Sequence, residues 1–177
     1  LENLAYHEAI PGHHMQIAIA LEVEGMPSFR KYGGYSVFSE GWALYSETLP
    51  KEIGLYKDPY SDFGRLSGEL WRACRLVVDT GIHHYRWTRE EGIDYYMNNT
   101  ANPEGDCVGM VERHIVWPGQ AVSYKIGMLK IQELRAYAEL SLGTKFSLQA
   151  FHDIVLKNGG VPMDILQDIV YQWVGSQ

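Results

Sequence analysis

Signals that start and stop helices recur along almost the whole chain, and they constrain its fold more than any other feature. Asp58-Pro59 is a helix N-cap followed by a proline at the first helical position, and the helix is expected to end at Gly81. The segment Thr88 to Glu91 has the form of a capping box and begins a helix that reaches about Asn98. No segment alternates apolar and polar residues over more than a few positions, as a half-buried strand would. The pattern therefore predicts an all-α fold.

Apolar spacing and Gly or Pro punctuation extend this prediction to the rest of the chain. The segment Ala101 to Pro118 gives weak structural signals and is predicted to be a loop. The helix that begins at Asp58 carries five apolar residues at helical spacing, namely Phe63, Leu66, Leu70, Cys74 and Val77. The other expected helices span residues 4–23, 39–49, 118–143, 147–157 and 162–174.

The length and composition fit a single folded domain that covers residues 1–177. A chain of 177 residues is close to the size of one domain, and its 46% hydrophobic and 21% charged residues are ordinary for a globular protein. The net charge of −7 and the lack of a basic stripe argue against a nucleic-acid partner. The apolar runs are too short to span a membrane. The two cysteines are far apart in sequence and do not form a thiolate zinc motif.

The position of the most chemically distinctive segment bears on the domain organisation. That segment begins at residue 7, and the chain starts with Leu1 and not with methionine. We expect the chain to be the C-terminal portion of a longer helical protein, with the N-terminal remainder as a partner. Because a targeting segment would lie in that remainder, the compartment is left open.

The segment from His7 to His14 places three imidazoles and one carboxylate, Glu8, within eight residues. Neutral imidazole is the commonest metal ligand in proteins, and a neighbouring carboxylate can activate a metal-bound water. Two histidines, His13 and His14, are candidates for the second ligand. On a regular helix His14 lies about 20° from His7, and His13 lies about 240° away. Pro11 interrupts such a helix and can bring His13 round instead. The segment therefore predicts a metal site with His7 and either His13 or His14.

A second segment, residues 39–47, supplies two carboxylates on one helix face. Glu40 and Glu47 are separated on that face by apolar residues, and carboxylates there are costly unless they are paired or bound to metal. Glu40 is predicted to be the third metal ligand, although a carboxylate at a helix start is also favoured by the helix dipole. Glu47 is predicted to accept a hydrogen bond from a ligand histidine and to orient its ring.

Several segments together resemble the bacterial "domain of unknown function 885" family. They are residues 7–14, 39–47, 78–83, 115–121 and 124–127, so the resemblance spans most of the chain. The arrangement is also similar to that of gluzincin-type zinc peptidases. This similarity implies zinc bound by His7, by His13 or His14, and by Glu40, with Glu8 as general base. The chain departs from the gluzincin pattern by a lengthening around Pro11.

Four further residues and one acidic neighbour are candidates for substrate and transition-state contacts. The resemblance nominates Tyr124 as a donor to the oxyanion of the tetrahedral intermediate. His83 is a candidate for proton transfer or for orienting the substrate, with Asp79 as its acidic partner. Arg113 and Arg135 are candidates for holding a peptide carboxylate through a bidentate fork.

The function expected from these residues is zinc-dependent peptide hydrolysis, a metallopeptidase-like activity on a peptide substrate. Two alternatives remain open. One is a metal-binding helical domain without peptidase activity, and the other is a helical interaction module in which the histidines only pack.

Overall fold

The computed structural model describes residues 1–177 and contains α-helices with no β-strand, which confirms the all-α prediction. No helix is both long and apolar enough to cross a bilayer. The helices in chain order are α1 (Glu2–Glu8), α2 (His13–Glu22), α3 (Ser28–Tyr32), α4 (Ser36–Ser46), α5 (Leu49–Glu52), α6 (Pro59–His83), α7 (Arg89–Asn99), α8 (Glu104–Val116), α9 (Ser123–Leu142), the 3-10 turn η1 (Gly143–Lys145), α10 (Leu148–Leu156) and α11 (Met163–Gly175).

The predicted helix caps at the start of α6 and α7 are present. The Asp58 carboxylate accepts a hydrogen bond from the backbone N–H of Tyr60 at 3.0 Å. Thr88 and Glu91 form the reciprocal pair of a capping box, because each side chain bonds the other residue's backbone N–H. Helix α6 continues to His83, two residues beyond the expected end at Gly81. Local side-chain signals thus place helix starts more accurately than helix ends.

Two expectations about helix extent are wrong. Residues 101–118 are not a loop, because Glu104–Val116 form α8. The helix expected from Pro118 begins only at Ser123, whereas the helical segment 4–23 is broken between α1 and α2, around Pro11, where an interruption was expected. Gly119 has a φ of +79°, which a right-handed helix cannot include. Helix α8 was missed because its stability comes from burying Cys107 and Val111 against neighbouring helices, which local propensity does not report.

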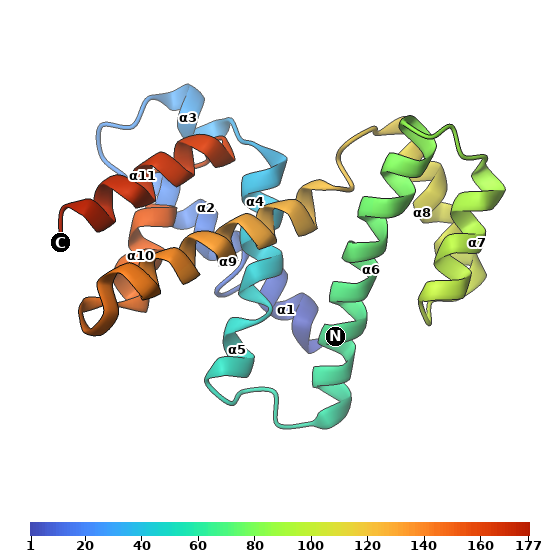
Figure 1. Ribbon diagram of the computed structural model, residues 1–177, viewed down its shortest axis with the longest axis horizontal. Helices are drawn as coiled ribbons and strands as arrows, with labels where there is room; N and C mark the ends of the chain where they lie inside the picture. The colour runs from blue at the N-terminus through green and yellow to red at the C-terminus, as the bar shows by residue number, and fades with distance from the viewer.

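The larger buried cluster lies where α4 and α9 cross. It also includes residues of α10 and α11, which lie on the same side of the molecule (Figure 1). It includes Phe38 and Trp42 from α4, Met128 from α9 and Phe151 from α10, all at 1% exposure or less. Helices α4 and α9 touch backbone to backbone at a pair of glycines, Gly41 and Gly127. A Cβ atom added to Gly41 would lie 2.5 Å from the Cα of Gly127. This close crossing fixes the point at which α4 packs along α9.

A second buried cluster holds α7 and α8 against α6, on the opposite side of the molecule from α10 and α11 (Figure 1). Its members include Trp71 and Val78 of α6, Tyr96 of α7 and Val111 of α8. Of the predicted apolar stripe on α6, only Cys74 belongs to this cluster. The other four members are exposed, with fractions of 64% for Phe63, 51% for Leu66, 47% for Leu70 and 38% for Val77.

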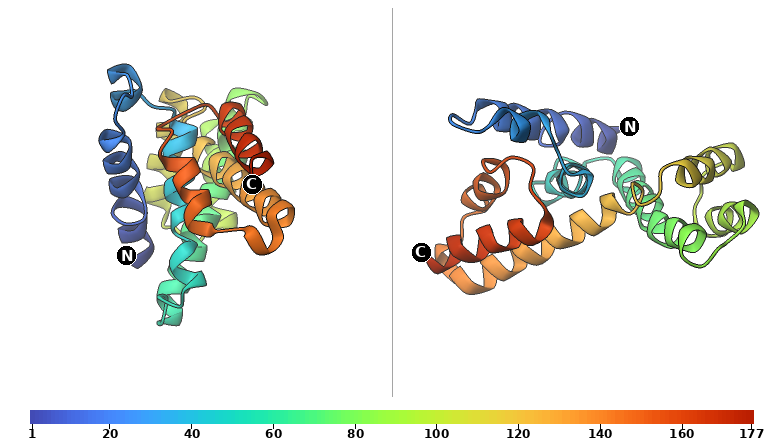
Figure 2. Two further views of the ribbon diagram at one scale, coloured as in Figure 1. Left: turned by 90° about the vertical axis from the view of Figure 1, so that its left-hand side faces the viewer. Right: turned by 90° about the horizontal axis from the view of Figure 1, so that it is seen from above.

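Helices α1 and α2 follow one another along one side of α4, and α9 lies on its other side (Figure 2). Helix α4 therefore runs between the N-terminal helices and the main core. Because α4 carries residues 39–46, this layer arrangement places them against the break between α1 and α2.

Candidate metal centre

The turn between α1 and α2 is held in place by hydrogen bonds from α4. The carbonyl oxygen of Pro11 accepts from the indole Nε1 of Trp42 at 2.8 Å and from the hydroxyl of Ser46 at 3.3 Å. The Ile10-Pro11 peptide bond is cis. Trp42 is fully buried, so its indole N–H needs such an internal partner. The turn is therefore tied to a rigid part of the main core.

Gly12 lets the two sides of this turn approach each other closely. A Cβ atom at this position would overlap the carbonyl oxygen of His7, so no larger residue fits without moving the turn. Helix α2 begins at the next residue, His13. As a result the rings of His7 and His13 meet edge to face with centroids 4.8 Å apart, although the two residues belong to different helices.

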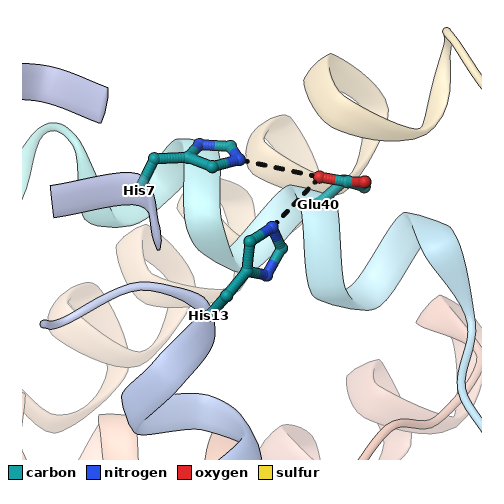
Figure 3. Close-up of side chains that lie close together, drawn as sticks. All are labelled: His7, His13 and Glu40. Atoms are coloured by element: carbon teal, nitrogen blue, oxygen red, sulfur yellow. Dashed lines mark ion pairs between the residues drawn. The ribbon is translucent and has the colours of Figure 1, made fainter. Parts of the chain in front are cut away.

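Three side chains converge at this turn, and Figure 3 shows both imidazoles directed at one carboxylate oxygen. The Oε2 atom of Glu40 lies 3.3 Å from Nε2 of His13 and 3.7 Å from Nε2 of His7. One ligand atom from each of the three residues lies within 4.8 Å of the others. Ligand atoms in a tetrahedral zinc site are about 3.4 Å apart, given metal–ligand distances of about 2.0–2.2 Å. The donor types and their spacing therefore fit a zinc ion.

The cluster is closed on one side and open on the other. The side chain of His7 is 4% exposed, while those of His13 and Glu40 are 21% and 18% exposed. Three protein ligands with an accessible fourth position are the usual arrangement in catalytic zinc sites, whereas structural sites are closed by four. The exposure thus leaves room for water or a substrate atom beside His13 and Glu40.

Glu47 lies on the side of the His7 ring opposite Glu40 and forms a short hydrogen bond with that ring. Its Oε1 is 2.8 Å from Nδ1 of His7, and its Oε2 accepts from the amide of Asn3 at 2.9 Å. Arg72 of α6 approaches the same carboxylate at 3.4 Å. Glu47 is 1% exposed, so Arg72 and Asn3 stabilise a charge that would otherwise be costly to bury. This arrangement directs the Nε2 lone pair of His7 toward the cluster.

The electrostatics of the cluster favour a bound cation. Burial alone would raise the pKa of the Glu40 carboxyl, but the neighbouring imidazoles of His13 and His7 outweigh it and lower the pKa to about 2. Burial lowers the pKa of His7, but the neighbouring carboxylates of Glu40 and Glu47 outweigh burial and raise that pKa. A positive charge is therefore stabilised here, either as a proton on imidazole or as a metal ion.

Tyr124 of α9 is a further member of the site. Its ring stacks on that of His7 with centroids 6.3 Å apart, and the Tyr124 hydroxyl also helps to lower the pKa of Glu40. Gln120 donates to the Tyr124 hydroxyl at 3.3 Å. The guanidinium of Arg75, a residue of α6, lies 4.5 Å from the centre of the Tyr124 ring. The tyrosine nominated from the sequence thus lies against the histidine cluster.

Two residues of the histidine segment do not join the cluster. His14 is exposed on α2 and forms no side-chain hydrogen bond or ion pair. The structure therefore favours His13 over His14 as the partner of His7. Glu8, the predicted general base, is also exposed and forms neither a hydrogen bond nor an ion pair, so its carboxylate is unengaged at the end of α1.

His83 and Asp79 lie at the far end of α6 and not at the cluster. The Nε2 of His83 hydrogen bonds to the carbonyl of His114 at 2.8 Å. His83 is eleven residues beyond Arg72, which is roughly 16 Å along a helix. Asp79 accepts from the backbone N–H of Gly119, at 3.1 Å to one carboxylate oxygen. Asp79 therefore anchors the loop that leads into α9 and forms no hydrogen bond with His7 or His13.

The two predicted substrate arginines have other partners. Arg135 makes a bidentate ion pair with Glu52, with both distances at 2.8 Å, and also pairs with Glu139. The guanidinium of Arg135 is thus already paired, and the prediction that Arg135 holds a substrate carboxylate is not supported. Arg113 is exposed, and its guanidinium lies 5.2 Å from the centre of the Trp117 ring.

Sequence reasoning missed the residues that support the cluster, namely Asn3, Arg72, Arg75 and Trp42. Asn3, Arg72 and Arg75 belong to no motif, and they reach the site only because α1 and α6 pack together. Trp42 carried a weak signal, since a tryptophan among apolar residues on α4 is expected to be buried and to need a partner for its N–H.

Comparisons with known proteins identify the family of this chain. The chain is similar to a crystal structure described as "the putative lipoprotein from Colwellia psychrerythraea", with 52% identity and a TM-score of 0.98, covering 100% of this chain and 30% of that chain. It is also similar to a structure described as "a putative lipoprotein of unknown function from Shewanella oneidensis", with 27% identity and a TM-score of 0.88, covering 96% of this chain and 31% of that one. Among curated proteins, none matches this chain. The family model described as "Bacterial protein of unknown function (DUF885)" matches residues 1–170, and the chain therefore belongs to that family.

Proposed function

We propose that His7, His13 and Glu40 bind one zinc ion and that the chain forms the metal centre of a peptide hydrolase. The observation that carries this proposal is the convergence of three ligand atoms, from α1, α2 and α4, within 4.8 Å of one another. The hydrogen bond that Glu47 accepts from Nδ1 of the buried His7 adds support, because ligand histidines usually have such a partner on their other nitrogen.

The residues present suggest a division of roles. Bound zinc would supply Lewis-acid activation of a water molecule. Glu8 would accept a proton from that water and deliver it to the leaving amine, as a general base and then a general acid. Tyr124 lies against His7 and Glu40, where its hydroxyl can donate to an oxyanion that develops beside them.

One observation favours a second candidate, a metal-binding domain without hydrolysis. The Glu8 carboxylate is exposed and forms no hydrogen bond or ion pair with the cluster. A general base has to come within hydrogen-bonding reach of the water that it activates, although such contacts often form only in the substrate complex. The behaviour of a Glu8 variant therefore separates the two candidates.

The chain spans about 30% of the length of the solved structures that it resembles. The activity and the peptide substrate of a whole protein are therefore proposals, and so is a partner role for a preceding part of the protein. The single-domain description of residues 1–177 also remains a proposal.

The test is metal analysis of protein purified without a histidine tag, combined with a peptide-cleavage assay. We expect about one zinc per chain in the wild type and in Glu8→Gln, with cleavage lost only in Glu8→Gln. Glu24→Gln is the matched control, because Glu24 is exposed and unpaired on the loop after α2. Protein without zinc after dialysis against zinc would contradict the metal site. Bound zinc with no cleavage by the wild type would instead support the second candidate.

A further inference from the structure

A cavity of about 490 Å³ opens beside the histidine cluster, and His13 belongs to both. Residues of α2, of α3 and of the start of α4 line it. Its volume lies within the range of small-molecule sites, about 300–1,000 Å³. A ligand whose reacting bond lay at the cluster would therefore extend into this cavity past His13.

Gln16 lines the cavity and carries a buried polar atom without a partner. It lies three residues after His13 on α2, so the two side chains share one helix face. Gln16 is 7% exposed, and its Oε1 is buried with no hydrogen-bond partner. Buried polar atoms are nearly always paired, so an unpaired acceptor on a residue of the cavity wall is a candidate partner for an N–H group of a ligand.

Two cations line the same cavity without a carboxylate partner. Arg30 donates to the carbonyl of Asn158 at 2.6 Å, and Lys31 donates to the carbonyl of Leu21 at 2.8 Å. Neither side chain forms an ion pair, whereas Arg65, Arg72, Lys125 and Arg135 all do. Carbonyl partners leave the positive charges unneutralised, and two such charges favour an anionic ligand group.

We propose that this cavity binds the carboxylate of a short peptide, with Arg30 and Lys31 pairing with the carboxylate and Gln16 accepting an N–H of the adjoining amide. This inference rests on the proposed function and deepens it, because it makes the substrate a peptide with a negative charge close to the scissile bond. The carboxylate is either the peptide's C-terminus or an acidic side chain. Arg30 and Lys31 thus take the place of the predicted Arg135.

The test measures binding to the whole chain by NMR titration, in metal-free and in zinc-loaded protein. The probes are acetyl-glycyl-glycine, its C-terminal amide, and acetyl-glutamyl-glycinamide. We expect the free acid to shift the signals of Gln16, Arg30 and Lys31, and the uncharged amide to bind at least about tenfold more weakly, as for the loss of a charged hydrogen bond. Comparable binding of the glutamyl probe would identify a side-chain carboxylate as a source, and its failure to bind would identify the C-terminus.

Substitutions test the assigned side chains. Arg30→Met and Lys31→Met should each weaken binding of acetyl-glycyl-glycine about tenfold. Lys57→Met, which removes an exposed and unpaired lysine outside the cavity, should leave it unchanged. Equal binding of acid and amide, or binding unaffected by both cavity substitutions, would overturn the proposal. Binding to metal-free protein would support the cavity even if zinc did not bind. Zinc binding without carboxylate preference would remove this inference and leave the metal centre.

Discussion

The buried ring of His7 lies between two carboxylates, with Nδ1 2.8 Å from Glu47 and Nε2 3.7 Å from Glu40. One carboxylate belongs to the proposed ligand set, and the other lies behind the ring with Asn3 and Arg72. Both come from the segment of α4 and its C-cap, seven residues apart. A short stretch of one helix thus supplies both a candidate metal ligand and the group that orients another.

Replacement of Glu47 by glutamine should weaken zinc binding without abolishing it. The amide can still accept from Nδ1 of His7, but it lacks the charge that increases the basicity of the ring. Loss of such a partner typically costs about 10–100-fold in metal affinity. Competition with a chelator measures this change, with Glu24→Gln as the control. Unchanged affinity in Glu47→Gln would show that the hydrogen bond does not support metal binding.

The neighbouring histidines should respond differently to substitution. His13→Ala removes a donor that lies 3.3 Å from Glu40, whereas His14→Ala removes an exposed ring without contacts. We expect zinc to be lost from His13→Ala and to remain at about one equivalent in His14→Ala. Metal content after dialysis distinguishes them. The reverse result would mean that α2 rotates when the ion binds.

Replacement of Gly12 by alanine should destabilise the protein and weaken zinc binding, because the added Cβ overlaps the carbonyl oxygen of His7. Crowding of this kind costs about 1–3 kcal/mol. Gly64→Ala is the matched control, because a Cβ at this position of α6 meets nothing within 4 Å. That change should leave stability equal or higher by up to about 1 kcal/mol, since alanine is a better helix former. Urea denaturation measures both, and equal stabilities would show that the turn relaxes without cost.

His114 should make stability depend on pH. Burial, followed by the charges of Arg75 and Arg113, lowers its pKa to about 4, and its Nε2 is paired with the hydroxyl of Tyr96. The unfolded chain takes up this proton near pH 6.5 while the folded chain does not, so stability is present above pH 6.5 and is lost as the pH falls toward 4. A shift of this size corresponds to about 3 kcal/mol.

Urea denaturation of metal-free protein at pH 7 and at pH 4.5 measures this effect. His114→Gln should show a smaller loss between the two pH values than the wild type. His84→Gln, which changes an exposed histidine, should behave like the wild type. Part of the dependence should persist in His114→Gln, because burial also lowers the pKa of His152 to about 4. Identical losses in wild type and His114→Gln would contradict the assignment.

The sequence by itself determined the helical class, the capped starts of α6 and α7, and the residue types of the candidate metal site. These features depend on neighbours within one or two helical turns, so a local pattern carries them. The pairing of His7 with His13 was not determined in this way. Regular helix geometry favours His14, but Gly12 and the hydrogen bonds from Trp42 and Ser46 to Pro11 break the helix and turn His13 toward Glu40.

Tertiary packing also decided which charged side chains are available. Arg135 is occupied because α5 brings Glu52 to it, and Arg30 and Lys31 are unpaired because no acidic side chain lies within ion-pairing distance of them. Helix α8 exists because its apolar face is covered by α6 and α7. Each outcome depends on groups that are distant in sequence, whose positions are fixed only when the whole core packs.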